Sequence, residues 1–319
     1  MPPPSQPHRA LLERAVLAAL EGDYSAACSS AHTVLESGVS GEERLSVYRL
    51  LIDWNRAIGD AVECKRLASR AVREGSEDLG QTHEAVLVAR NSELYWMCMV
   101  GYDSVAKTRF ASLIKDVKKT LGATSDLMWA VRVNSAMPAK LSGDFKRAAA
   151  IYRELAADME KVVAPSDIAL LTVRDNLAEV LALADDFDEA RGVYAALLDT
   201  LVAEFGEEDW RCLRVRGEIA EIDYYRLGYD QVLDQWLDLI ADYERAGAPG
   251  SERALRMVSL LIAAAIEAED FQTARTWLAR LIADPPSELN ERDVEELEAM
   301  MREYDEGLAP AGCARTGSA

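Results

Sequence analysis

The sequence predicts an all-α protein made of stacked helical hairpins. Similar segments that open with a Gly-Asp-type turn recur along the 319-residue chain, at steps of 37 to 43 residues. The turn positions are residues 22, 59, 101, 143, 185, 228 and 269. A period in this range is typical of supersecondary units that stack side by side. Apolar runs with a period of two are absent, so no β-strand is expected.

Each turn is followed by a helix with one apolar face. A mostly small residue lies five positions after the turn, at Ala27, Cys64, Ala106, Ala148, Ala190, Leu233 and Ala274. A larger side chain follows four residues later, at Phe110, Tyr152, Tyr194, Leu237 and Leu278. This spacing places both kinds of residue on the same side of an α-helix, where the small one lets a neighbouring helix approach closely.

A second helix is expected before each turn, which gives seven helix-turn-helix pairs. We expect residues 1–7 to be a flexible N-terminus and residues 8–286 to hold the repeats. Residues 287–306 carry 9 acidic and 2 basic residues and are expected to form a capping helix. Residues 307–319 are expected to be disordered.

The composition narrows the possible functions. The net charge is −20, from 55 acidic and 35 basic residues, and such a chain repels nucleic-acid phosphates. Residues 90–161 are locally basic, with 12 Lys or Arg against 8 Asp or Glu. No apolar run is long enough to span a membrane, and the N-terminal residues lack the apolar core of a signal peptide. Five scattered cysteines favour reduced thiols and a cytoplasmic location, and the excess of Arg over Lys suits a GC-rich bacterial genome.

The pattern resembles the tetratricopeptide repeat (TPR), in its longer, kinesin-light-chain-like form that also occurs in bacterial signalling proteins. The features that carry the resemblance are the small residue after the turn, the aromatic residue four positions later and the 42-residue period. The resemblance covers residues 8–284 and implies an α-solenoid, a right-handed superhelix with a concave groove lined by the first helix of each pair. TPR solenoids generally bind segments of other proteins along this groove.

Polar residues recur along the predicted groove. Arg90, Arg132, Arg174 and Arg216 follow one another at intervals of 42, and the resemblance implies that Asn134 and Asn176 clamp a peptide backbone. The candidate ligand-binding residues are Asn91, Tyr95, Arg132, Asn134, Met137, Lys140, Arg174, Asn176, Glu179, Tyr224 and Tyr225.

These residues also have structural interpretations. The asparagines could bond their own scaffold. The arginines could form an internal salt-bridge ladder between adjacent repeats, with the acids six or seven residues upstream of each, namely Glu84, Asp126, Asp167 and Asp209. One of the two neighbouring tyrosines is expected in the core. Pro138 should bend the helix that contains it, because it removes the bond to the carbonyl of Asn134. Gly217 is expected to open space on the first helix of repeat 6.

No metal-binding or catalytic motif is recognisable. The leading hypothesis is therefore a non-enzymatic scaffold or adaptor that needs no cofactor or metal and binds an acidic or C-terminal protein segment. A second hypothesis is a bacterial signal-sensing regulator that sequesters a partner without a DNA-binding domain of its own. A third is an enzyme or biosynthetic helper with a small-molecule pocket. No nucleic-acid or membrane partner is expected, and homodimerisation remains open.

Overall fold

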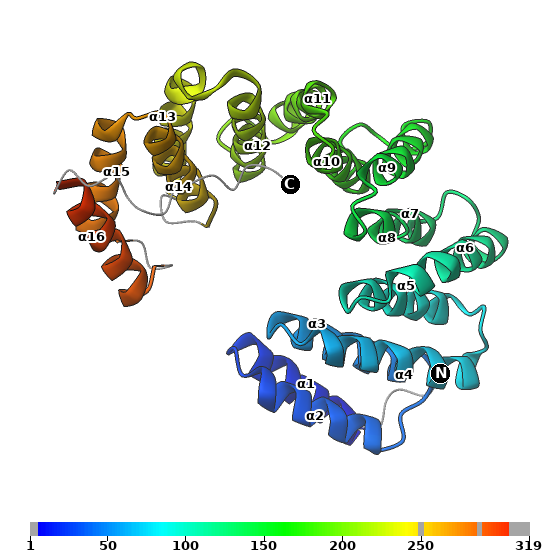
Figure 1. Ribbon diagram of the computed structural model, residues 1–319. Coiled ribbons are helices and arrows are strands. Elements are labelled where there is room, and N and C mark those ends of the chain that lie inside the picture. Colours follow the sequence, from blue (N-terminus) through cyan, green and yellow to red (C-terminus); the bar gives the residue numbers. More distant parts are fainter. Residues whose placement is uncertain (1–5, 248–251, 286–288, 306–319) are drawn as a thin grey trace. The chain divides into compact units, whose positions relative to one another are not determined.

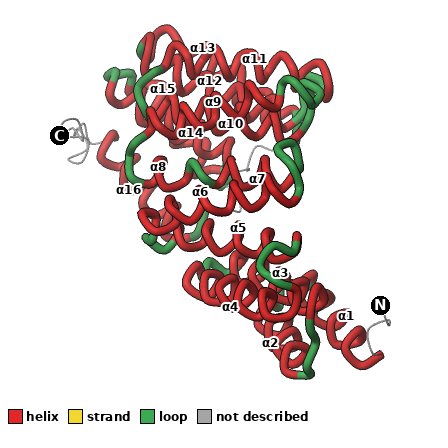
Figure 2. Tube along the Cα trace, turned by 90° about the vertical axis from the view of Figure 1, so that its right-hand side faces the viewer, coloured by secondary structure: helices red, strands yellow, loops and turns green. Residues whose placement is uncertain are grey.

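The computed structural model describes residues 6–247, 252–285 and 289–305, and every regular element in these ranges is a helix (Figures 1 and 2). The helices of the first half are α1 (Gln6–Leu20), α2 (Tyr24–Glu36), α3 (Gly41–Ala57), α4 (Ala61–Leu79), α5 (Glu84–Met99), α6 (Asp103–Thr120), α7 (Asp126–Asn134), α8 (Met137–Leu141) and α9 (Phe145–Met159). They are followed by α10 (Ile168–Leu183), α11 (Phe187–Phe205), α12 (Trp210–Leu227), α13 (Tyr229–Arg245), α14 (Glu252–Glu267), α15 (Phe271–Ala283) and α16 (Glu291–Asp305). The seven predicted helical pairs are confirmed, since each predicted turn lies between two of these helices.

The chain forms two compact units, Met1–Val173 and Arg174–Ala319, and the boundary falls inside α10. Within the first unit, α2 packs on α3, α4 on α5 and α6 on α7, so neighbouring pairs stack in chain order. In the second unit the same order holds for α11 to α15. The handedness of the predicted superhelix stays a prediction.

The Gly-Asp turn has a clear physical basis. Gly22 adopts a φ of 81°, a left-handed conformation that L-residues with a Cβ disfavour. The side chain of Asp23 then accepts a hydrogen bond from the backbone N–H of Ala26 and caps α2. The left-handed φ recurs at all seven predicted turns, and in repeats 5 and 7 it is adopted by Asp185 and Glu269, at 59° and 61°.

Each unit has its own core, built around the small residues after the turns. Ala27, Cys64, Ala106, Ala148, Ala190 and Ala274 are fully buried, as predicted. Repeat 6 differs, because only Gly228 separates α12 from α13. This shorter turn shifts the buried face by one residue, so that Val232 and Trp236 lie in the core while Leu233 and Leu237 are only half-buried. Leu233 and Leu237 thus pack against the core, as predicted, but at its margin, and Val232 and Trp236 take the buried positions.

The first helix of repeat 4 is broken, as Pro138 predicted. It forms two helices, α7 and α8, that are separated by Ser135 and Ala136, and Pro138 lies in the first turn of α8. At the other end of the chain, α16 packs on α15, and its Leu297, Met300 and Met301 contact the core of the second unit. Residues 287, 288 and 306 of the predicted capping helix, residues 1–5 and the predicted tail, with Cys313, lie outside the described residues.

Candidate functional site

Three of the four recurring arginines join the two helices of a repeat. Arg90 pairs with Asp116 at 2.8 Å, Arg132 with Asp158 at 2.9 Å, and Arg216 with Asp242 at 2.5 Å. The acids of the first two pairs lie 26 residues downstream of their arginines, and the third pair keeps this offset. Every acid is therefore on the second helix of the same repeat. We call these pairs the ladder.

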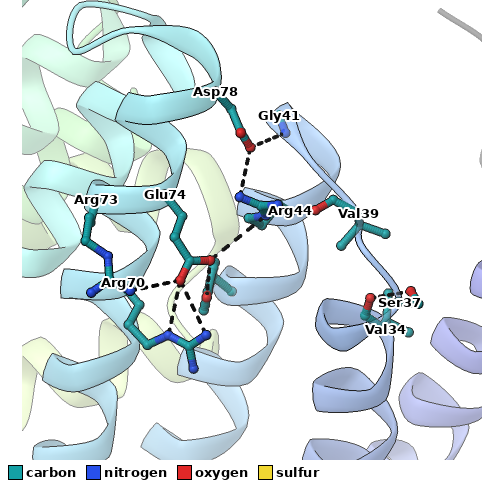
Figure 3. Close-up of polar contacts among 10 residues, drawn as sticks. Val34, Ser37, Val39, Gly41, Arg44, Arg70, Arg73, Glu74 and Asp78 are labelled. Atoms are coloured by element: carbon teal, nitrogen blue, oxygen red, sulfur yellow. Dashed lines mark hydrogen bonds and ion pairs between the residues drawn. The ribbon is translucent and has the colours of Figure 1, made fainter.

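In repeat 2 the ladder continues with a tyrosine in place of the arginine. Tyr48 takes in repeat 2 the position that Arg90 takes in repeat 3. The Tyr48 hydroxyl donates a hydrogen bond of 2.7 Å to Glu74, again 26 residues downstream. Figure 3 shows that the Glu74 carboxylate also forms ion pairs with Arg70 and Arg73 of its own helix and lies near Arg44 of α3. The repeated geometry indicates that these positions hold each hairpin together.

The ladder corrects the predicted partners of Arg90, Arg132 and Arg216. The upstream acids lie at the beginnings of helices instead. Asp167 accepts hydrogen bonds from the N–H groups of Ala169 and Leu170, and Asp209 caps α12. Carboxylates are favoured there because they face unpaired N–H groups and the positive end of the helix dipole.

The asparagines of the first unit bond each other. The Nδ2 of Asn134 on α7 donates to the Oδ1 of Asn91 on α5 at 3.2 Å, and both side chains are half-buried. This bond uses one donor of the Asn134 amide, which can form up to four hydrogen bonds. Asn134 therefore supports the scaffold and retains capacity toward a ligand.

A cavity of about 730 Å³ lies between the first helices of repeats 4 and 5, entirely within the first unit. Its apolar lining includes Trp129 and Val133 from α7, and Ile168 and Val173 from α10. The remaining lining residues are Asp126, Ala130, Asn134, Val163, Ser166, Asp167, Ala169 and Thr172. Ile168 is 75% exposed, so its apolar side chain is open to solvent beside the cavity. We call this feature the α7–α10 cavity.

Asn134 is the one predicted site residue that lines the α7–α10 cavity. Tyr95 instead packs edge-on against Trp96, with ring centroids 5.1 Å apart, and belongs to the margin of the core. Met137 and Lys140 are half-buried on α8, and the guanidinium of Arg132 lies against Asp158 and over the ring of Trp129. The structure therefore does not gather the predicted set of the first unit at one place.

The predicted residues of the second unit lie on α10 and α12. Arg174, Asn176 and Glu179 are on α10, where Arg174 and Asn176 are half-buried and Glu179 is exposed. Tyr224 packs on Trp236, with a centroid distance of 5.3 Å, and its hydroxyl donates to Glu267. Tyr225 is 60% exposed and stacks on Phe187 at 5.6 Å. One of the two tyrosines thus packs against the core, as expected.

A second cavity, of about 160 Å³, lies between the first helices of repeats 6 and 7 in the second unit. Its lining residues are Arg214, Gly217, Glu218, Glu221, Tyr243, Arg253, Arg256, Met257 and Leu260. We call it the α12–α14 cavity. The sequence indicated two of its members. Gly217 leaves space on α12, and Glu218 takes in repeat 6 the slot that Asn134 and Asn176 take in repeats 4 and 5.

Metal-binding and membrane-spanning features are missing from the described parts of the chain. These parts contain no group of three or more His, Cys, Asp or Glu residues that could hold a metal ion. None of their helices combines the length and the apolar character that a membrane crossing requires.

Comparison with known proteins shows the fold. Neither a family model nor a curated protein matches the sequence. A variant of a putative kinesin light chain with nearly identical TPR-like repeats, from Podosopora anserina, is similar in structure, with a TM-score of 0.57 at 15% identity over 66% of this chain and 99% of that chain. BtubC (BKLC) from P. vanneervenii gives a TM-score of 0.55 at 18% identity over 83% and 96% of the two chains.

A Rap protein in complex with Competence and Sporulation Factor is similar over 93% of this chain and 76% of its own, with a TM-score of 0.55 at 13% identity. Identities this low show the architecture alone. The chain thus has a TPR-like repeat fold, which confirms the predicted fold class.

Proposed function

We propose that this chain is a non-enzymatic protein that binds a segment of another protein in the α7–α10 cavity. The observation that carries the proposal is the cavity itself, about 730 Å³ with an apolar lining, because binding sites are typically concave and apolar with a few placed polar groups. Asn134 offers such a group. The Rap protein, bound to Competence and Sporulation Factor, is a precedent for ligand binding by a similar fold.

The charge around the cavity does not support the predicted acidic segment. Asp126 and Asp167 are among its lining residues, and no Lys or Arg of the described chain is. The nearby Arg132 is already neutralised by Asp158. We therefore propose an apolar segment without acidic residues, whose side chains fill the space beside Trp129 and Ile168 and whose backbone bonds Asn134.

A blocking substitution tests the site. Ala130 lines the cavity and is exposed, so Ala130→Arg places a long charged side chain at the mouth without disturbing the core. Ala150→Arg is a matched control, since Ala150 is also exposed but lies on α9, the second helix of the same repeat.

The probe is a peptide selected on the wild-type protein from a displayed random library, with its affinity measured by fluorescence anisotropy. We expect Ala130→Arg to weaken binding at least tenfold, or about 1.4 kcal/mol, and Ala150→Arg to leave it unchanged. Failure to select any peptide, or equal binding to both variants, would refute the proposal.

The second candidate, a signal-sensing regulator that sequesters its partner, is favoured by the similarity to the Rap protein over 93% of this chain. It predicts that the selected peptide changes the dimensions of the full chain in small-angle scattering, whereas a rigid adaptor predicts unchanged dimensions. A cytoplasmic, bacterial setting and a possible homodimer stay predictions from the sequence.

A further inference from the structure

Asn134, Asn176 and position 218 follow one another at intervals of 42 on the first helices of repeats 4, 5 and 6, and we call them the asparagine row. The α12–α14 cavity lies where this row changes its chemistry. Glu218 takes in repeat 6 the position that Asn176 takes in repeat 5, so a carboxylate replaces the amide. Beside it, Gly217 leaves room, because a Cβ there would lie 3.7 Å from the Cε of Met257 and 3.8 Å from the hydroxyl of Tyr243. The missing side chain thus keeps the space between α12 and α14 open.

The charged residues around this cavity are unevenly paired. Arg256 donates to Glu221 at 2.6 Å, and Arg214 lies 2.8 Å from Asp175. Arg253 lies 3.8 Å from Glu218, which is too far for a hydrogen bond. Arg253 and Glu218 therefore both line the cavity without a hydrogen bond between them.

Two polar groups at this point lack hydrogen bonds within the described part of the chain. The Glu218 carboxylate is 27% exposed and accepts none, although burial raises its pKa. The Tyr243 hydroxyl belongs to a side chain that is 5% exposed and also makes none. The Glu218 carboxylate and the Tyr243 hydroxyl therefore keep hydrogen-bonding capacity toward the cavity, which a ligand that enters it can use.

We propose that the α12–α14 cavity binds a free L-α-amino acid with an apolar side chain. Its ammonium group would donate to Glu218 and Tyr243, and its carboxylate would accept from Arg253, whose side chain is 49% exposed and free to move toward it. Met257 and Leu260 supply the apolar wall. The volume of about 160 Å³ is similar to that of a cavity that holds a benzene-sized molecule, on the order of 150 Å³, which suits the side chain of one amino acid.

The zwitterion is the charge pattern that this lining fits. Arg214 and Arg256 already pair with Asp175 and Glu221, which leaves Arg253 and Glu218 as the charges open to a ligand. A simple cation would face Arg253, and a simple anion would face Glu218. A ligand that carries both charges can place each one against its opposite. Such binding would add a small-molecule effector to the protein, at a site that is separate from the α7–α10 cavity.

Titration calorimetry and thermal unfolding of the full chain test the proposal, with L-leucine and L-methionine as probes. We expect binding of at least one of them, and a loss of at least tenfold when either end is blocked, as the N-acetyl derivative or the methyl ester. Glu218→Gln should weaken binding at least tenfold, because it removes the charge that holds the ammonium group.

A cavity-filling variant supplies the steric test. Gly217→Val extends its methyl groups into the cavity and should abolish binding, whereas Gly192→Val, at an exposed helical glycine with no atom within 4 Å of its Cβ position, should retain it. Absence of binding by both amino acids, equal binding of the blocked derivatives, or equal binding by Gly217→Val would overturn the proposal. If Gly217→Val does not fold, Glu218→Gln decides in the same way. Ala130→Arg should leave amino-acid binding unchanged, so this proposal and the proposed function can fail separately.

Discussion

A double-mutant cycle on Arg132 and Asp158 tests whether the ladder is structural. Each residue is replaced by alanine, singly and together, and stability is measured by urea unfolding. Arg132 Nη1 and Asp158 Oδ2 are 2.9 Å apart, and the two side chains are 20% and 47% exposed. Hydrogen bonds between charged groups contribute roughly 1.5–3 kcal/mol when shielded, whereas exposed ion pairs contribute about 0.2–1 kcal/mol. The partial exposure of Asp158 places the expected coupling at about 1 kcal/mol.

The cycle is needed because Asp158 also pairs with Lys161 at 3.0 Å, so that Asp158→Ala alone removes two interactions. The coupling should fall in about 1 M salt, where the screening length is about 3 Å. Hydrogen bonds from Lys161 and Arg132 lower the pKa of Asp158 below 3.8. The stabilisation should therefore be present at neutral pH and disappear as the pH falls through the lowered pKa.

One result would refute the structural interpretation of Arg132. If the coupling is absent at low salt, and Arg132→Ala leaves the unfolding midpoint unchanged while abolishing binding of the selected peptide, Arg132 acts on the ligand. The same cycle on Arg216 and Asp242 is an internal comparison, and it should give a coupling at least as large, because Asp242 is only 15% exposed.

Two further predictions concern stability and are checked by urea or thermal unfolding. A Cβ on Gly75 would lie 2.8 Å from Leu45 Cδ2. Overpacking of this kind costs about 1–3 kcal/mol, and alanine gains about 1 kcal/mol in helix propensity over glycine. Gly75→Ala should therefore destabilise the protein by about 1 kcal/mol. Gly192→Ala has open space instead and should stabilise by about 1 kcal/mol; a stabilised Gly75→Ala would contradict the packing argument. Glu218→Gln should raise stability at pH 7, because burial raises the carboxyl pKa above 4.5 and the ionised form, which dominates above that raised pKa, is disfavoured in the folded state. The gain in stability should vanish below pH 4.5, where the carboxyl group is neutral in both states. A gain that does not depend on pH would exclude titration of Glu218 as its cause. The titratable and charged groups that face Glu218 in the cavity are Arg214, Glu221, Arg253, Arg256 and Tyr243.

The hairpins could be predicted because their causes are local. Each hairpin is set by residues that lie within one or two helical turns of each other. They are a glycine in the left-handed conformation, an aspartate that caps the next helix, and a small residue five positions after the turn. The register of α13 could not be predicted in the same way. Gly228 indicates another turn, but nothing local shows that it alone separates α12 from α13 and so moves Val232 and Trp236 into the core.

The ladder partners and cavities depend on packing between helices. Asp116 meets Arg90 only because two antiparallel helices bring the residues together, so spacing along one helix pointed to the wrong acids. A signal was nonetheless present, since acids recur at Glu74, Asp116, Asp158 and Asp242 with the same offset. The α7–α10 cavity left no such mark, because Ala130 and Ile168 look like ordinary helix residues until two helices stand side by side.

In a repeat protein the regular rows and their exceptions carry different information. A position that repeats its residue type meets the same need in several hairpins. For Arg90, Arg132 and Arg216 the ladder shows that this need is to hold the second helix of the repeat on the first. A ligand meets the protein at one place, so its site should differ from the neighbouring repeats. Glu218 in the asparagine row and Gly217 beside it are such exceptions, and both line the α12–α14 cavity. If Glu218→Asn, which restores the row, retained amino-acid binding, the exception would have no functional meaning and the assignment of this cavity would fail.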